Sequence, residues 1–280
     1  MQLLYLLIQF TLLVSVPVRS RPFSIMSALA ARSDGGSNNN EDDSCNNNNN
    51  NNFNSDSKRI GDELEQKLEV LFEEARSLPI SLSRDDGNIE IRNTFEPGES
   101  GDEMVTLAEA KFVAGNPNSY KRYLENFNAA FEEVDPMVKK VHSLERDGNE
   151  REGIKVFLKF ASPVSDRVMV HWKYVKLNHG VNKDEHLMML SEKGNANLLR
   201  KYLTKEESDN NVLARTFLCA YWIKPIYEKD DTNKIIGSNI RYVYSGNVGG
   251  YMPKRLINFL GPKTALSSLK GMIGYGEKKE

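Results

Sequence analysis

Near its C-terminus the chain reads NIRYVYS (residues 239–245), then GNVGGYMP (246–253), then KRLINFL (254–260). The first segment alternates polar and apolar side chains with the period of a β-strand. Gly249 and Gly250 interrupt that strand, and Pro253 leads into an amphipathic helix. A strand that ends on glycines and continues into a C-terminal helix is typical of a curved sheet closed by that helix.

Apolar periodicity divides the rest of the chain into helices and strands. Residues 62–78 carry apolar side chains at helical spacing, and residues 117–131 form a second, aromatic-rich helical pattern. Strand patterns occupy residues 103–113, 154–160, 168–175, 187–191, 212–223 and 240–245. This order favours an α+β fold with one antiparallel sheet over a doubly wound parallel sheet. A sheet wrapped around a long helix leaves a cavity between them, which suits an apolar ligand.

Composition excludes several classes of function. The chain has 280 residues, 39% of them hydrophobic and 27% charged, as in an ordinary globular protein. A net charge of −2 gives no electrostatic case for nucleic acid. The 4 histidines and 2 cysteines lack the close spacing of a zinc site, so we expect no metal and no other cofactor.

The first 59 residues differ from the rest. Residues 3–18 are nearly continuously apolar but fall short of the ~20 residues that span a bilayer. Val18 and Ser20 are small residues at the −3 and −1 positions of a cleavage site, which favours a signal peptide over residues 1–20. An uncleaved anchor and the first half of an organelle-targeting leader are the alternatives. We therefore expect the protein in the secretory pathway or an endomembrane or organelle lumen, with secretion possible.

Residues 21–59 form an Asn-rich tract with few apolar side chains. Such a tract cannot bury enough surface to offset the entropy of ordering it, so we expect a disordered linker. The folded domain then covers residues 60–280.

Four motifs occur in order along that domain: DPMVKKV (135–141), SPVSDRVMV (162–170), VLAR (212–215) before YWIKP (221–225), and GGYMP (249–253). Together they resemble the START domain, the lipid-transfer module related to steroidogenic acute regulatory protein. Val134 departs from the Trp usual there, and Val168 and Met169 replace Asp and Phe.

The resemblance implies a helix-grip fold, in which a curved antiparallel sheet wraps around a long C-terminal helix and encloses a lipid cavity. The implied ligand is one phospholipid, sterol or sphingolipid, and the C-terminal helix would gate its exchange with a transiently contacted membrane. We expect a monomer.

Strand parity and the closing helix indicate which side chains contact the lipid. On the strand 168–175, Met169 and His171 share one face, and on the strand 212–223 the small-residue face carries Ala214, Thr216 and Leu218. The closing segment adds four apolar candidates, Met252, Leu256, Phe259 and Leu260.

Other features carry alternative interpretations. We expect Arg167 and Arg215 to be ion-pair partners rather than ligand clamps, and Gly261-Pro262 to kink or interrupt the closing helix. Residues 192–211 are either the gating loop or a surface insertion.

Enzymatic function is disfavoured. His142, His171, His179 and His186 are scattered, and no Gly-x-Ser-x-Gly motif is present, so we identify no catalytic residue. A helix-grip cyclase or hydrolase remains an alternative by fold analogy alone. A lipid sensor or scaffold that does not transfer its ligand is a third possibility.

Overall fold

The structure is a computed structural model that describes residues 50–84, 88–98, 101–113, 115–147, 151–160, 164–250 and 252–278. The expected signal peptide, residues 1–20, and residues 21–49 of the expected linker lie outside the described residues. The elements in chain order are α3 Asn50–Arg76, β1 Ile80–Arg84, β2 Ile89–Gly98, β3 Gly101–Val113, α4 Pro117–Glu125, α5 Phe127–Val134, β4 Val138–Asp147, β5 Arg151–Leu158, β6 Arg167–His179, β7 Glu185–Ser191, α6 Ala196–Tyr202, α7 Lys205–Asn210, β8 Val212–Leu213, β9 Arg215–Glu228, β10 Asp231–Asn247 and α8 Lys254–Glu277.

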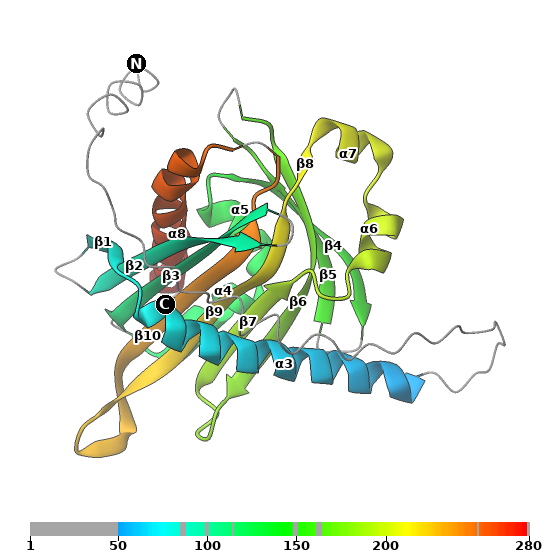
Figure 1. Ribbon diagram of the computed structural model, residues 1–280. Helices are drawn as coiled ribbons and strands as arrows, with labels where there is room; N and C mark the ends of the chain where they lie inside the picture. Colours follow the sequence, from blue (N-terminus) through cyan, green and yellow to red (C-terminus); the bar gives the residue numbers. More distant parts are fainter. Residues whose placement is uncertain are drawn as a thin grey trace.

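One sheet of ten strands organises the described part of the chain (Figure 1). Its order is β1-β2-β3-β10-β9-β7-β6-β5-β4, and neighbours on this path pair antiparallel. The short strand β8 lies off the path and pairs with β6 in parallel. The single antiparallel sheet expected from the sequence is confirmed.

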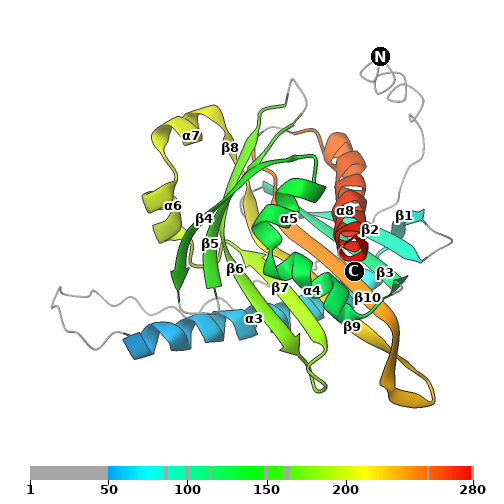
Figure 2. The same cartoon turned by 180° about the vertical axis from the view of Figure 1, so that it is seen from behind.

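Helices cover both faces of this sheet. Helix α8 lies with α4 and α5 against the concave face, and α3 crosses the opposite face (Figures 1 and 2). Each face therefore has its own apolar core. The core on the concave face includes Tyr123, Phe127 and Leu269, and the core under α3 includes Leu68 and Trp222.

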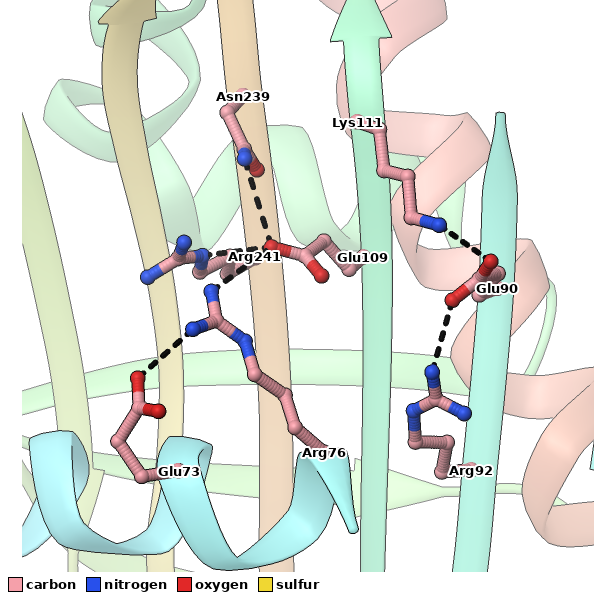
Figure 3. A network of polar contacts seen from close by, with 8 residues as sticks. All are labelled: Glu73, Arg76, Glu90, Arg92, Glu109, Lys111, Asn239 and Arg241. Carbon is pink, nitrogen blue, oxygen red and sulfur yellow. Dashed lines mark hydrogen bonds and ion pairs between the residues drawn. The ribbon is translucent and has the colours of Figure 1, made fainter. Parts of the chain in front are cut away.

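Charged side chains fasten the C-terminal end of α3 to the sheet (Figure 3). Arg76 of α3 reaches Glu109 of β3 at 3.4 Å, and Arg241 of β10 donates to the same carboxylate at 2.8 Å. Asn239 donates to it as well. Burial by itself would raise the pKa of Glu109, but the two arginines hold it below its ordinary value. The network holds the end of the helix against the adjacent strands β3 and β10.

Several element boundaries differ from expectation. Helix α3 begins at Asn50, inside the tract expected to be a disordered linker, and the helical pattern 117–131 splits into α4 and α5 at Asn126. Strand β4 was not predicted.

Gly261-Pro262 does not interrupt the closing helix, since α8 continues through Pro262. Both residues are buried, and Gly261 packs closely on Met104 of β3. Packing against the sheet thus stabilises a helix that proline alone would weaken. In the described part of the chain, no helix is long and apolar enough to span a membrane.

Candidate functional site

A cavity lies between the concave face of the sheet and the first half of α8. Its volume, counted over positions open to the centre of a water molecule, is about 120 Å³. A single water needs only about 10–15 Å³ on that scale, so the space admits a larger ligand. The side chains around it are Met104, Thr106, Phe131, Asp135, Met137, Leu158, Phe160, Arg167, Met169, His171, Leu190, Ala214, Thr216, Cys219, Tyr242, Tyr244, Val248, Met252, Ile257, Leu260, Gly261, Thr264, Ala265 and Ser268.

The cavity is deepest toward the middle of the sheet. Leu190, Cys219 and His171 are buried there, whereas Phe160, Val248 and Met252 are half-buried where residues 158–160 and 164–167 meet the junction between β10 and α8. We call this half-exposed end the rim.

Beyond the deep end the interior is filled by aromatic rings. The Tyr221 ring lies 4.9 Å from that of Tyr242 and 5.7 Å, edge to face, from that of Tyr123. Burial raises the pKa of each of these three phenols, which keeps them neutral. The cavity therefore ends on an uncharged aromatic floor.

Strand β6 places Met169 and His171 in the cavity wall, as strand parity indicated. The His171 side chain is buried, and neither Nδ1 nor Nε2 has a hydrogen-bond partner. Burial lowers the pKa of His171 to about 3, so its ring is neutral at physiological pH. It is a polar group within a largely apolar wall.

Ala214, between β8 and β9, and Thr216 of β9 lie in the wall, but Leu218 lies on the opposite face, in the core under α3. The expectation for Leu218 is wrong because β9 carries a β-bulge. Gly246 of β10 pairs with Thr216 and the next residue back, Ser245, pairs with Leu218, so one extra residue lies between them. An extra residue reverses the alternation, and Cys219 lines the cavity instead.

Helix α8 and the segment before it place Leu260 and Met252 in the wall, but not Leu256 or Phe259, for which the expectation is wrong. The face turned inward runs through Ile257 and Leu260 to residues 261, 264, 265 and 268, at helical spacing. Phe259 instead lies under the ammonium of Lys263, with Nζ 3.6 Å from the ring centroid. The sequence suggested the wrong face because both faces of this helix are partly apolar.

The two rim arginines differ. Arg215 forms the expected ion pair, its Nε donating to both carboxylate oxygens of Glu192 at 2.9 and 3.2 Å. Arg167 has no carboxylate partner within the described residues, so the ion-pair expectation is wrong for it. Its guanidinium is 2% exposed and donates to the carbonyl oxygens of Val248 (3.1 Å), Gly249 (3.3 Å) and Ser165.

Arg167 therefore joins the two segments that form the rim. Its guanidinium carbon also lies 4.9 Å from the centroid of the Phe160 ring. Burial lowers the pKa of Arg167, which shows that its charge is poorly hydrated. The same contacts hold the segment between β10 and α8 at Gly249. This position requires glycine, because its φ is +70° and a Cβ there would collide with Leu213 O.

A second polar connection ties α8 to the turn after α5. Asp135 is buried in the cavity wall and accepts hydrogen bonds from Met137 N (2.9 Å) and Ser268 Oγ (3.1 Å). Burial raises its pKa above the ordinary value, and the two donors oppose that change.

An ion pair lies beyond His171 on the same strand. Lys173 Nζ is 2.6 Å from Glu152 Oε2 on β5, and Asn128 of α5 accepts from the same ammonium at 3.2 Å. Both charged side chains are nearly buried, and neither lines the cavity. Sequence reasoning missed this pair, because no local pattern shows that Lys173 faces Glu152.

Residues 192–211 do not line the cavity. Helix α6 from this segment packs Leu198 into the core under α3, on the other face of the sheet. Lys155 of β5 donates to Glu207 of α7 at 2.7 Å, which holds the second helix there as well. Of the two alternatives, the surface insertion describes its position, and residues 158–160 and 164–167 lie at the rim instead.

Most lining residues were not predicted. Those on α5, on the turn after it and on β3 come from segments far from the candidate strands in sequence, and no pattern in the sequence says which helix faces which strand. The alternation of Tyr242 and Tyr244 in β10 was the signal that could have found two more. Among the described residues, no group of three or more His, Cys, Asp or Glu side chains is placed to hold a metal ion.

Comparison with known proteins identifies the fold. No protein-family model and no curated protein sequence matches the chain. Among solved structures, human StAR-related lipid transfer protein 5 matches with a TM-score of 0.61 and 11% identity, over 80% of this chain and 98% of that one. Human STARD10 matches with a TM-score of 0.54 and 14% identity, over 76% of this chain and 79% of that one. The lipid transfer and protein localization domain of human StarD13 matches with a TM-score of 0.52 and 14% identity, over 74% of this chain and 95% of that one. The chain therefore has the helix-grip fold of the StAR-related lipid-transfer (START) domains.

Proposed function

We propose that this protein binds one lipid in the cavity between the sheet and α8 and carries it between membranes. The observation that supports this most directly is the cavity itself, a mostly apolar space under a C-terminal helix in a START fold. Burying an acyl chain or ring system there stabilises the complex by roughly 0.8 kcal/mol per CH₂, so no catalytic group is needed.

The first experiment asks whether lipid is present and whether it moves. Protein purified from cells is examined by native mass spectrometry, followed by lipid extraction, and is then assayed for transfer between donor and acceptor vesicles. We expect a co-purifying lipid and transfer above background. An empty protein that transfers nothing contradicts the proposal, whereas one that loads lipid without transferring it is a sensor.

In this proposal α8 is the gate. Its N-terminal half contacts β2 through a hydrogen bond from Asn93 Nδ2 to Asn258 Oδ1, 3.2 Å long, and both side chains are solvent-accessible. Replacing both with cysteine and bridging them with a short cleavable thiol-reactive crosslinker would hold the helix closed. We expect transfer to stop on crosslinking and to return on cleavage, with Asn258→Cys alone unaffected. Unchanged transfer by the crosslinked protein contradicts gating by α8.

Exchange also requires a membrane surface. The exposed Arg255 and Lys263 of α8 would face anionic lipid near the rim, each contributing about 1 kcal/mol. Transfer should therefore be faster with anionic acceptor vesicles and slower after both are changed to Gln. Equal rates with neutral vesicles contradict this part of the proposal.

We further propose that residues 1–20 direct the protein into the secretory pathway. Cleavage after Ser20 would leave Arg21 as the first residue of the mature protein. Mass spectrometry of the mature N-terminus tests this, and an intact Met1 on protein outside the secretory compartments contradicts it.

A further inference from the structure

His171 is a polar side chain that the described part of the protein leaves without a partner. It lies in the cavity wall, is 1% exposed, and forms no hydrogen bond through Nδ1 or Nε2. A buried donor or acceptor left unpaired is costly, so native proteins nearly always satisfy such groups.

The surrounding side chains explain why the chain supplies no partner. The residue paired with His171 on β5 is Ile154, and Leu190 and Cys219 line the same deep end. Other polar side chains of the wall already have partners, since Thr216 Oγ1 contacts Met169 Sδ at 3.4 Å and Tyr244 OH donates to Arg215 O at 3.4 Å. Asp135, likewise in the wall, accepts from Met137 and Ser268. A molecule inside the cavity is therefore the available partner for the imidazole.

The protonation state of the ring limits which molecule fits. A neutral imidazole offers one donor and one acceptor, and a hydroxyl can serve either nitrogen because it also both donates and accepts. A phosphate or carboxylate only accepts and carries a charge that this apolar end of the cavity would have to desolvate.

The cation in the wall is too far away to change this conclusion. Arg167 is four residues from His171 on β6, which corresponds to about 13 Å along a strand. Its guanidinium is bonded to the carbonyl oxygens of Ser165, Val248 and Gly249 at the rim. Lys173, two residues beyond His171, is paired with Glu152 and does not line the cavity. Among the described residues, the deep end thus offers no free positive charge to an anionic headgroup.

We propose that the ligand is an uncharged lipid with a free hydroxyl, such as a sterol, a diacylglycerol or a ceramide, and that His171 binds that hydroxyl. This inference rests on the proposed function, because it assigns the ligand class of the same cavity. His171 acts here as a specificity-determining residue.

The test compares lipids that differ only at the hydroxyl. Full-length protein is incubated with vesicles that contain cholesterol or its methyl ether, dioleoylglycerol or its 3-acetyl ester, and ceramide or its 1-O-methyl ether. Vesicles of dioleoylphosphatidylcholine and dioleoylphosphatidic acid complete the set, and loading is measured by native mass spectrometry. We expect at least one free-hydroxyl lipid to load about 10-fold more than its blocked partner and more than either phospholipid.

Variants assign the preference to the imidazole. His171→Leu should reduce it to about 2-fold or less, while His171→Gln, which keeps a donor and an acceptor, should retain part of it. Leu187→Met changes a buried residue in the core under α3, on the other face of the sheet, and should leave the preference intact. Urea unfolding of each variant confirms that it is folded before loading is compared.

The outcomes separate the two proposals. A protein that loads no lipid of any class refutes the proposed function. Three other outcomes refute only the assignment of the ligand class to His171: lipid loads without a hydroxyl preference, a phospholipid is preferred, or the preference persists in His171→Leu. In each of these cases the imidazole bonds to buried water instead.

Discussion

Replacing each rim arginine with methionine should separate two residues that look equivalent in sequence. Arg167→Met removes three hydrogen bonds from a charged donor to the carbonyl oxygens of Ser165, Val248 and Gly249. Each such bond contributes about 1.5–3 kcal/mol, and the cost of burying a guanidinium without a carboxylate, several kcal/mol, offsets part of the total. We expect a net loss of about 3 kcal/mol in the free energy of unfolding.

Arg215→Met is the matched control. Arg215 also lies over a phenylalanine ring, but 47% of its side chain is exposed and it pairs with Glu192. Exposed ion pairs contribute about 0–1 kcal/mol, so this variant should unfold almost like the unmodified protein.

Urea unfolding measures both losses, and hydrogen exchange reports where Arg167→Met acts. The amide of Gly249, which donates to Asn247 Oδ1 at 2.8 Å, should exchange faster because the junction is no longer held. Equal losses for the two variants, or an unchanged exchange rate at Gly249, would refute the assignment of Arg167 as the rim fastener.

Three further predictions concern the interior. Lys173→Met should lower the free energy of unfolding in urea by about 3–5 kcal/mol, because it leaves the nearly buried Glu152 without its ammonium partner. Adding Glu152→Gln should restore most of that stability. A double variant no more stable than Lys173→Met would contradict this prediction. On α8, a Cβ at Gly276 would lie 2.5 Å from a tyrosine ring. Gly276→Ala should therefore reduce the free energy of unfolding by about 1–3 kcal/mol and lower Tm. A Cβ at Gly274 would meet nothing within 4 Å, so Gly274→Ala should raise Tm instead. Equal Tm shifts for the two alanine variants would contradict the close packing at Gly276. Burial lowers the pKa of His171 to about 3, so below about pH 6.5 the unfolded chain binds a proton at this residue that the folded chain does not bind. The free energy of unfolding therefore decreases as the pH is lowered. Relative to His171→Phe, the loss should approach about 1.4 kcal/mol per pH unit between pH 6 and pH 4 in urea unfolding, and parallel pH profiles would contradict it.

Local pattern was sufficient where one residue's environment follows from its neighbours in sequence. The alternation around Met169 and His171 correctly predicted which face of β6 lines the cavity, and the glycines at 249 and 250 marked the end of β10. The four motifs, taken in order, led to the helix-grip fold.

Local pattern failed where pairing between distant segments decides orientation. Leu218 lies outside the cavity because β9 bulges against β10, and a bulge depends on the partner strand as much as on the strand itself. Leu256 and Phe259 turn away from the cavity because the contacts of α8 with β2, β3, α4 and α5 select one of two partly apolar faces.

The sequence by itself determined the class of fold and the end of the chain that closes it, since periodicity, glycine and proline act over a few residues. Only the tertiary structure decided that α8 continues through Pro262 and that, among the residues it describes, Arg167 has no ion-pair partner and His171 in the wall has no hydrogen-bond partner. The physical reason is that hydrogen-bond satisfaction and burial depend on which segments meet in space. Those contacts are made between residues as far apart as Arg167 and Gly249, beyond the reach of any local pattern.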